Sequence, residues 1–85
     1  MKVIYTKHAE DKLKRIDIKK FKINKKFIEI EVKNSDHKLR TKYGDFYVIT
    51  MVDSKHIVRI IYDIIEPDAK VITFHIARKG RYDEA

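Results

Sequence analysis

The chain of 85 residues contains no cysteine, one proline and two widely separated glycines. The absence of cysteine excludes disulfide bonds and metal sites built from thiolates. Two distant glycines cannot form a glycine-rich loop that binds phosphate through backbone N–H groups. No apolar run approaches the roughly 18 residues of a membrane span, and the N-terminus becomes polar too early for a secretory signal. We therefore expect a cytoplasmic protein with no membrane partner.

Residues that bind metals are also sparse. The four histidines lack the short spacings of a zinc site, and no carboxylate-rich loop is typical of a calcium or magnesium site. We therefore expect no metal and no cofactor, so that any catalysis would be acid–base and electrostatic work by Arg, Lys, His and Tyr side chains.

Positive charge is abundant. The formal net charge is +7, and charged residues make up 39% of the chain. Such an excess indicates a polyanionic partner, either nucleic acid or an acidic protein. One alternative is a solvated lysine coat that only confers solubility, and another is a small housekeeping domain whose charge reflects thermal adaptation alone. A chain of this size has room for one domain, residues 1–85, with one core.

The N-terminal pattern predicts a short strand followed by a helix. Val3–Tyr5 is a β-type run, and Thr6 offers an N-cap hydroxyl. From Lys7 to about Ile16 the apolar residues recur with helical spacing, at Ala9, Leu13 and Ile16.

Residues 17–32 are ambiguous. Ile23, Phe27 and Ile30 share one helical face, with Asn24 as an N-cap, whereas residues 28–32 alternate as a strand would. The cap and the length of the segment favour the helix.

Four runs joined by short turns predict the sheet. We expect an edge strand at His37–Lys42, a central strand at Phe46–Val52, and two further strands at His56–Ile65 and Ala69–Ala77. The fold class is therefore α+β, with an N-terminal strand and one or two helices packed on a four-stranded antiparallel sheet.

Strand alternation selects the first candidate site residues. Val58, Ile60 and Tyr62 form the more apolar face of their strand, so Arg59 lies on the other face. Arg59 either pairs with Asp63 on that face or clamps a phosphate group. By the same rule, His75 lies opposite the most apolar face of the last strand, where it could act as an acid or base.

Further basic residues extend this candidate surface. A tail follows the last strand and could converge on Arg59, and a polar stripe of helical spacing lies in the N-terminal helix. The tail residues are Arg78, Lys79, Arg81 and Tyr82, and the stripe residues are His8, Lys12 and Arg15.

Four short motifs carry a resemblance to a known family. They are Tyr5-Thr-Lys-His-Ala-Glu-Asp-Lys-Leu-Lys-Arg15, Val58-Arg-Ile-Ile-Tyr62, Val71-Ile-Thr-Phe74 and Arg78-Lys-Gly-Arg-Tyr82. In this order they resemble small proteins of the RelE/ParE toxin superfamily, closest to a branch that opens with a His-Ala helix. RelE-type members are metal-free endoribonucleases that cut mRNA, often in the ribosomal A site, whereas ParE-like members act on gyrase.

The resemblance implies roles for individual residues. Arg59 would bind the scissile phosphate, Arg78 or Arg81 would be the second arginine, and Tyr82 would take part in acid–base chemistry. Lys42 matches the lysines of the preceding strand. The implied function is a toxin-type mRNA endoribonuclease with RNA or the ribosome and an acidic antitoxin-like protein as partners. The alternative is a non-catalytic binder of RNA or antitoxin that uses the same surface.

Overall fold

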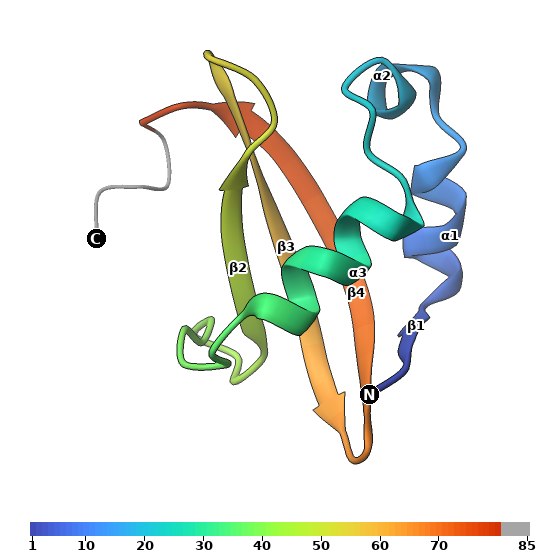
Figure 1. Ribbon diagram of the computed structural model, residues 1–85, viewed down its shortest axis with the longest axis vertical. Coiled ribbons are helices and arrows are strands. Elements are labelled where there is room, and N and C mark those ends of the chain that lie inside the picture. Colours follow the sequence, from blue (N-terminus) through green and yellow to red (C-terminus); the bar gives the residue numbers. More distant parts are fainter. Residues whose placement is uncertain (81–85) are drawn as a thin grey trace.

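A computed structural model describes residues 1–80 of the chain as an α+β fold with a four-stranded sheet and three helices (Figure 1). In chain order, the elements are β1 (Val3–Tyr5), α1 (Lys7–Leu13), α2 (Ile16–Lys19), α3 (Lys25–Asn34), β2 (Phe46–Met51), β3 (His56–Ile65) and β4 (Asp68–Arg78).

The sheet is mixed, so the expectation of a purely antiparallel sheet is wrong. Its strand order is β1-β4-β3-β2, and β2, β3 and β4 form an antiparallel meander. The N-terminal strand β1 pairs with β4 in parallel, with Val3 opposite Ala69. The chain therefore returns through the helices before β2 begins, and β2 becomes an edge strand instead of the expected central one.

The expected edge strand His37–Lys42 does not form, apart from one bridge between Arg40 and Phe46. Local hydrogen bonds from side chains compete with the ladder there. The Ser35 hydroxyl accepts from the backbone N–H of His37 at 3.1 Å, and the φ of His37 is 57°, which is left-handed and incompatible with a strand.

Both predicted helix caps are confirmed. The Thr6 hydroxyl accepts from Ala9 N, and the Asn24 side chain accepts from Phe27 N, where α3 begins. Residues 25–34 are therefore helical, as the cap favoured. The first helix is shorter than expected, because α1 ends at Leu13 and Ile16 is 85% exposed at the start of α2.

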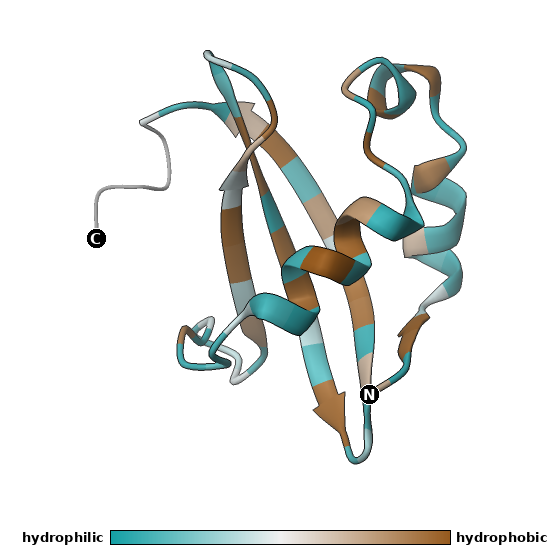
Figure 2. Ribbon diagram, viewed as in Figure 1, coloured by the Kyte–Doolittle hydropathy of each residue, from teal (hydrophilic) through white to brown (hydrophobic). Residues whose placement is uncertain are grey.

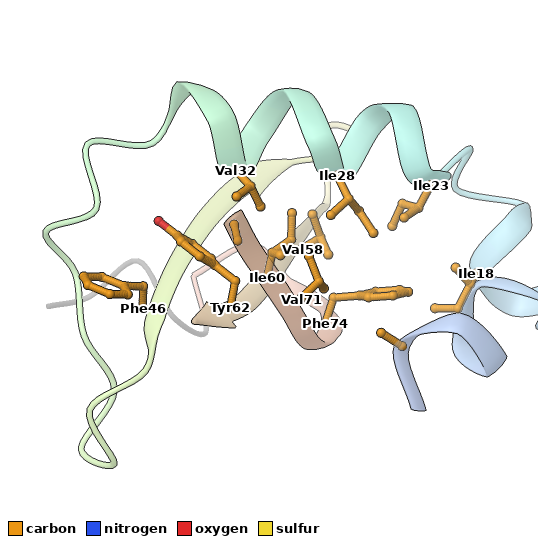
Figure 3. Close-up of a cluster of buried hydrophobic side chains, with 12 residues drawn as sticks. Ile18, Ile23, Ile28, Val32, Phe46, Val58, Ile60, Tyr62, Val71 and Phe74 are labelled. Atoms are coloured by element: carbon orange, nitrogen blue, oxygen red, sulfur yellow. The ribbon is translucent and has the colours of Figure 1, made fainter. Parts of the chain in front are cut away.

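All three helices contribute to a core on one face of the sheet. Figure 1 shows α3 crossing this face, and Figure 2 shows brown apolar stretches interrupted by single teal polar positions along β3. Val58, Ile60 and Tyr62 are fully buried, which confirms the predicted core face of β3. Figure 3 shows the buried cluster that these side chains form with Ile18, Ile23, Ile28, Val32, Phe46, Val71 and Phe74.

A β-bulge in β4 changes one expected assignment. The register shifts so that Ile60 pairs with Phe74 but Tyr62 pairs with Val71. Val71 is therefore fully buried beside Phe74, although simple alternation had placed these two residues on opposite faces. Beyond the bulge the alternation is as expected, and His75 lies on the face away from the helices.

Candidate functional site

Arg59 and His75 are direct cross-strand neighbours on the face of the sheet that faces away from the core. In residues 1–80 no helix covers this face, because the three helices pack on the opposite side; we call it the open face. Ile49 of β2 lies opposite Arg59 on its other side, so Ile49, Arg59 and His75 are side by side across three strands. Side chains in such directly opposed positions have Cβ atoms roughly 5 Å apart, so a single ligand can reach both residues.

Helix α1 adds a cation to His75 from the edge of β4. The start of α1 is anchored at the bulge, where Thr6 Oγ1 donates to the carbonyl oxygen of Ile72 at 2.8 Å. One side of the helix then lies along β4, and Lys12 Nζ comes within 3.3 Å of His75 Nδ1. An ammonium group can only donate, so Nδ1 accepts and the remaining proton of neutral His75 sits on Nε2.

The pKa shifts in this group follow from burial and crowded positive charge. Burial lowers the pKa of His75 below its usual value, and the nearby charges of Lys12, Arg59 and His8 lower it further. The pKa of Lys12 is also lowered, first by burial and then by the charge of Arg15, with Asp17 opposing the change. A bound anion would favour the charged forms of both groups.

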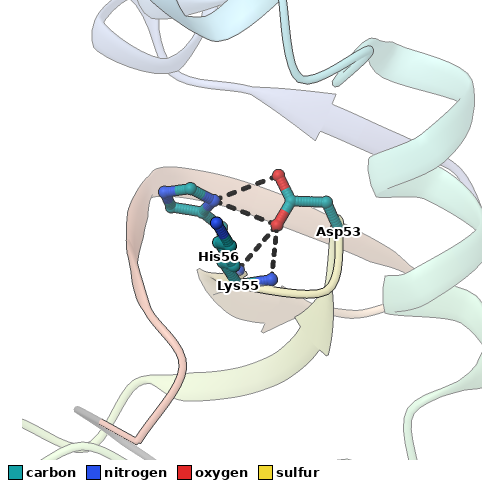
Figure 4. Close-up of polar contacts among 3 residues, drawn as sticks. All are labelled: Asp53, Lys55 and His56. Carbon is teal, nitrogen blue, oxygen red and sulfur yellow. Dashed lines mark hydrogen bonds and ion pairs between the residues drawn. The ribbon is translucent and has the colours of Figure 1, made fainter.

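A cleft of about 410 Å³ lies between the first two helices and the edge of β4, and we call it the edge cleft. Its polar and aromatic lining consists of Lys12, Arg15, Asp17, Lys20, Phe21, His56 and His75. Arg15 is held by Asp17 at 2.9 Å, and the rings of Phe21 and His56 lie 5.0 Å apart. Figure 4 shows the Asp53 carboxylate orienting His56 through Nδ1, at 3.0 Å.

A second cleft, of about 400 Å³, opens between the turn before β2 and the open face, and we call it the loop cleft. Its charged and aromatic lining consists of Arg40, Lys42, Tyr43, Asp45, Tyr47 and Arg59. The Arg59 guanidinium lies 4.4 Å from the centre of the Tyr47 ring. Arg59 thus leans toward β2, and the head groups of Arg59 and His75 line different clefts.

The structure brings together several predicted site residues. His8, Lys12 and Arg15, the residues of the predicted polar stripe, line one groove together with the carboxylate Asp11, although Arg15 follows the end of α1. Lys42 shares the loop cleft with Arg59.

Other predicted residues lie elsewhere. Arg78 pairs with His56 in the register, and alternation places both on the core side of the sheet, away from Arg59. The register therefore does not make Arg78 a neighbour of Arg59. The side chain of Lys79 is exposed beyond β4, with its backbone N–H bonded to Lys55 O at 2.8 Å. Arg81 and Tyr82 lie outside the described residues.

Sequence reasoning missed three residues of the loop cleft, Arg40, Tyr43 and Tyr47. Tyr47 could have been found by alternation, because it points to the same face as Ile49. Arg40 and Tyr43 lie in a segment expected to be a strand and a turn, and only the folded loop brings them to Arg59.

Two features are absent from residues 1–80. No helix in this range is long and apolar enough to cross a membrane, and no cluster of three or more His, Asp or Glu residues is arranged to hold a metal ion. Comparison with known proteins found no matching family model, no matching curated protein and no matching solved structure.

Proposed function

We propose that this chain is a metal-free endoribonuclease of the RelE type that cuts single-stranded mRNA, free or on the ribosome. The observation that carries the proposal is the cross-strand pair Arg59–His75 on the open face, with Lys12 hydrogen-bonded to His75. A guanidinium group binds phosphate oxygens in a bidentate manner, and an imidazole transfers protons near neutral pH. The net charge of +7 favours approach of a polyanion.

In the proposed reaction, the 2′-oxygen of the RNA attacks the adjacent phosphorus and the bond from phosphorus to the 5′-oxygen breaks. The products are a 2′,3′-cyclic phosphate and a free 5′-hydroxyl. Arg59 stabilises the charge that develops on the phosphoryl oxygens. His75 donates its Nε2 proton to the departing 5′-oxygen while Nδ1 takes a proton from Lys12, and the proton of the 2′-hydroxyl passes to water.

In this scheme Lys12 serves as the second cation, a role that the resemblance would give to Arg78 or Arg81. Its ammonium group lies beside His75, whereas Arg78 lies on the core side of the sheet. Tyr82, which the resemblance links to proton transfer, lies outside the described residues and has no part in this scheme.

Inducible expression in cells tests the proposal. Primer-extension mapping of transcripts should reveal new 5′ ends and growth should stop on induction, while Arg59→Ala should abolish both effects. The proposal would be contradicted if wild-type protein, expressed at the same level as Arg59→Ala, neither stopped growth nor produced new 5′ ends.

The second candidate function is non-catalytic binding of RNA or of an acidic antitoxin-like protein. One observation favours it: the head groups of Arg59 and His75 line different clefts instead of one. Such a binder would show steeply salt-dependent association with RNA and no cleavage. An acidic protein partner would suit the open face. There the cation Arg59 of β3 lies beside two apolar residues of β2, Ile49 and Met51.

A further inference from the structure

The loop cleft is built on a hydrogen-bonded turn that exposes an aromatic ring. Thr41 N donates to Asp45 O at 2.7 Å, and Gly44 N donates to Thr41 O at 3.0 Å. Gly44 has a φ of 94°, a conformation that favours glycine. The Tyr43 side chain is 81% exposed on this turn, although a large aromatic ring contributes most to stability when it is buried.

Cations accompany both aromatic rings of this cleft. Lys42 Nζ lies 5.2 Å from the centre of the Tyr43 ring, and the Arg59 guanidinium lies 4.4 Å from that of Tyr47. A third cation, Arg40, is fixed in place because its guanidinium donates to Gly44 O at 3.1 Å. Proteins that bind single-stranded nucleic acid combine these two features, with rings that stack on bases and cations that bind the backbone.

From this arrangement we infer that the loop cleft is a subsite for an unpaired nucleobase, which stacks on Tyr43 while its flanking phosphate lies against Lys42 and Arg59. The inference rests on the proposed function, since it extends the same RNA from Arg59 toward the β2 edge. It also restricts the substrate class to single strands, because the faces of bases in a duplex are already covered by their neighbours.

Among residues 1–80, Asp45 is the one carboxylate that lines the cleft. It would repel a ligand that offered phosphate alone. A carboxylate accepts hydrogen bonds from the exocyclic amino group of a base such as cytosine. A base with an amino group therefore matches the complete lining, and a cytosine run is the suitable probe.

The test measures binding of short labelled oligodeoxynucleotides by fluorescence anisotropy. DNA lacks the 2′-hydroxyl, so binding is measured without cleavage. The probes are a deoxycytidine run and an abasic run of equal length and charge. Wild type and Tyr43→Phe should bind the deoxycytidine run about tenfold more tightly than the abasic run, whereas Tyr43→Ala should bind the two alike. The exposed position of Tyr43 makes both variants compatible with folding.

Equal binding of both probes by wild type, no binding of either, or a base preference that survives in Tyr43→Ala would overturn the inference. A cleavage assay on RNA of the same sequence separates this result from the proposed function. Base preference without cleavage would support the subsite and contradict the nuclease. Cleavage without base preference would support the nuclease and contradict the subsite.

Discussion

Lys12 Nζ lies 3.3 Å from His75 Nδ1, although the two residues are 63 positions apart in the sequence. Because α1 lies beside β4 beyond the end of β1, Lys12 of the helix reaches His75 of the strand on the open face. The contact fixes the tautomer of neutral His75 with its proton on Nε2. This makes His75 a donor toward a phosphate ligand and Lys12 the source of its next proton.

Replacing the lysine tests this contact directly. We expect Lys12→Met to raise the pKa of His75 toward its ordinary value, because the neighbouring positive charge is removed. Recovery should be partial, since burial is the larger cause of the lowered pKa. NMR titration of the imidazole signals measures the change. Lys14→Met, which removes a charge that does not contact His75, is the control, and equal pKa values in the two variants would refute the contact.

Binding of nucleic acid should depend on pH through His75. The pKa of His75 in the free protein lies below about 6.5, and a bound phosphate favours the charged imidazole, so binding takes up a proton. The affinity for a single-stranded oligodeoxynucleotide should therefore rise as the pH falls below about 6.5. Anisotropy titrations at several pH values should show a smaller rise for His75→Asn. Parallel pH profiles for wild type and His75→Asn would count against a phosphate beside this residue.

Arg59→Lys retains the charge but loses the planar guanidinium and its contact with the Tyr47 ring. We expect the cleavage rate kcat to fall about 100-fold, with a smaller change in KM, because the bidentate contact matters most in the transition state. Lys2→Ala, which removes a charge near the turn between β3 and β4, should leave cleavage unchanged. Wild-type kinetics for Arg59→Lys would exclude a phosphate clamp.

The fully buried Tyr62 connects the core to the loop after α3. Its hydroxyl lies 2.8 Å from Ser35 Oγ and 2.7 Å from His37 Nδ1. Tyr62→Phe leaves both partners without this contact, and we expect a loss of about 1–2 kcal/mol in the free energy of unfolding. Urea denaturation should show no comparable loss for Tyr43→Phe, whose hydroxyl is exposed. Equal stability of Tyr62→Phe and wild type would contradict this role.

Local signals in the sequence predicted the elements that depend on local interactions. The caps at Thr6 and Asn24 marked two helix starts, and alternation in β3 identified both the core face and the position of Arg59. Each of these features depends on neighbours within a few residues, so the pattern along the chain contains the information.

Long-range relationships were not predictable in this way. The parallel pairing of the three-residue strand β1 with β4 depends on contacts between residues more than 60 positions apart, such as Val3 and Ala69. The bulge that buries Val71 shifts alternation by one position without a sequence signal. The same holds for the site, where Lys12 reaches His75 and the turn at Tyr43 reaches Arg59 only in the folded chain.

The chemistry of the new RNA ends distinguishes the proposed nuclease from a binding protein. Purified protein is incubated with a labelled single-stranded RNA, with and without ribosomes, and the new 3′ ends are analysed by mass spectrometry. Wild type should leave 2′,3′-cyclic phosphate ends, and Arg59→Lys and His75→Asn should form them much more slowly. No cut should occur where a single 2′-deoxy nucleotide replaces the mapped cleavage position. Intact RNA under both conditions, or cleavage that persists at the 2′-deoxy position, would contradict the proposed nuclease.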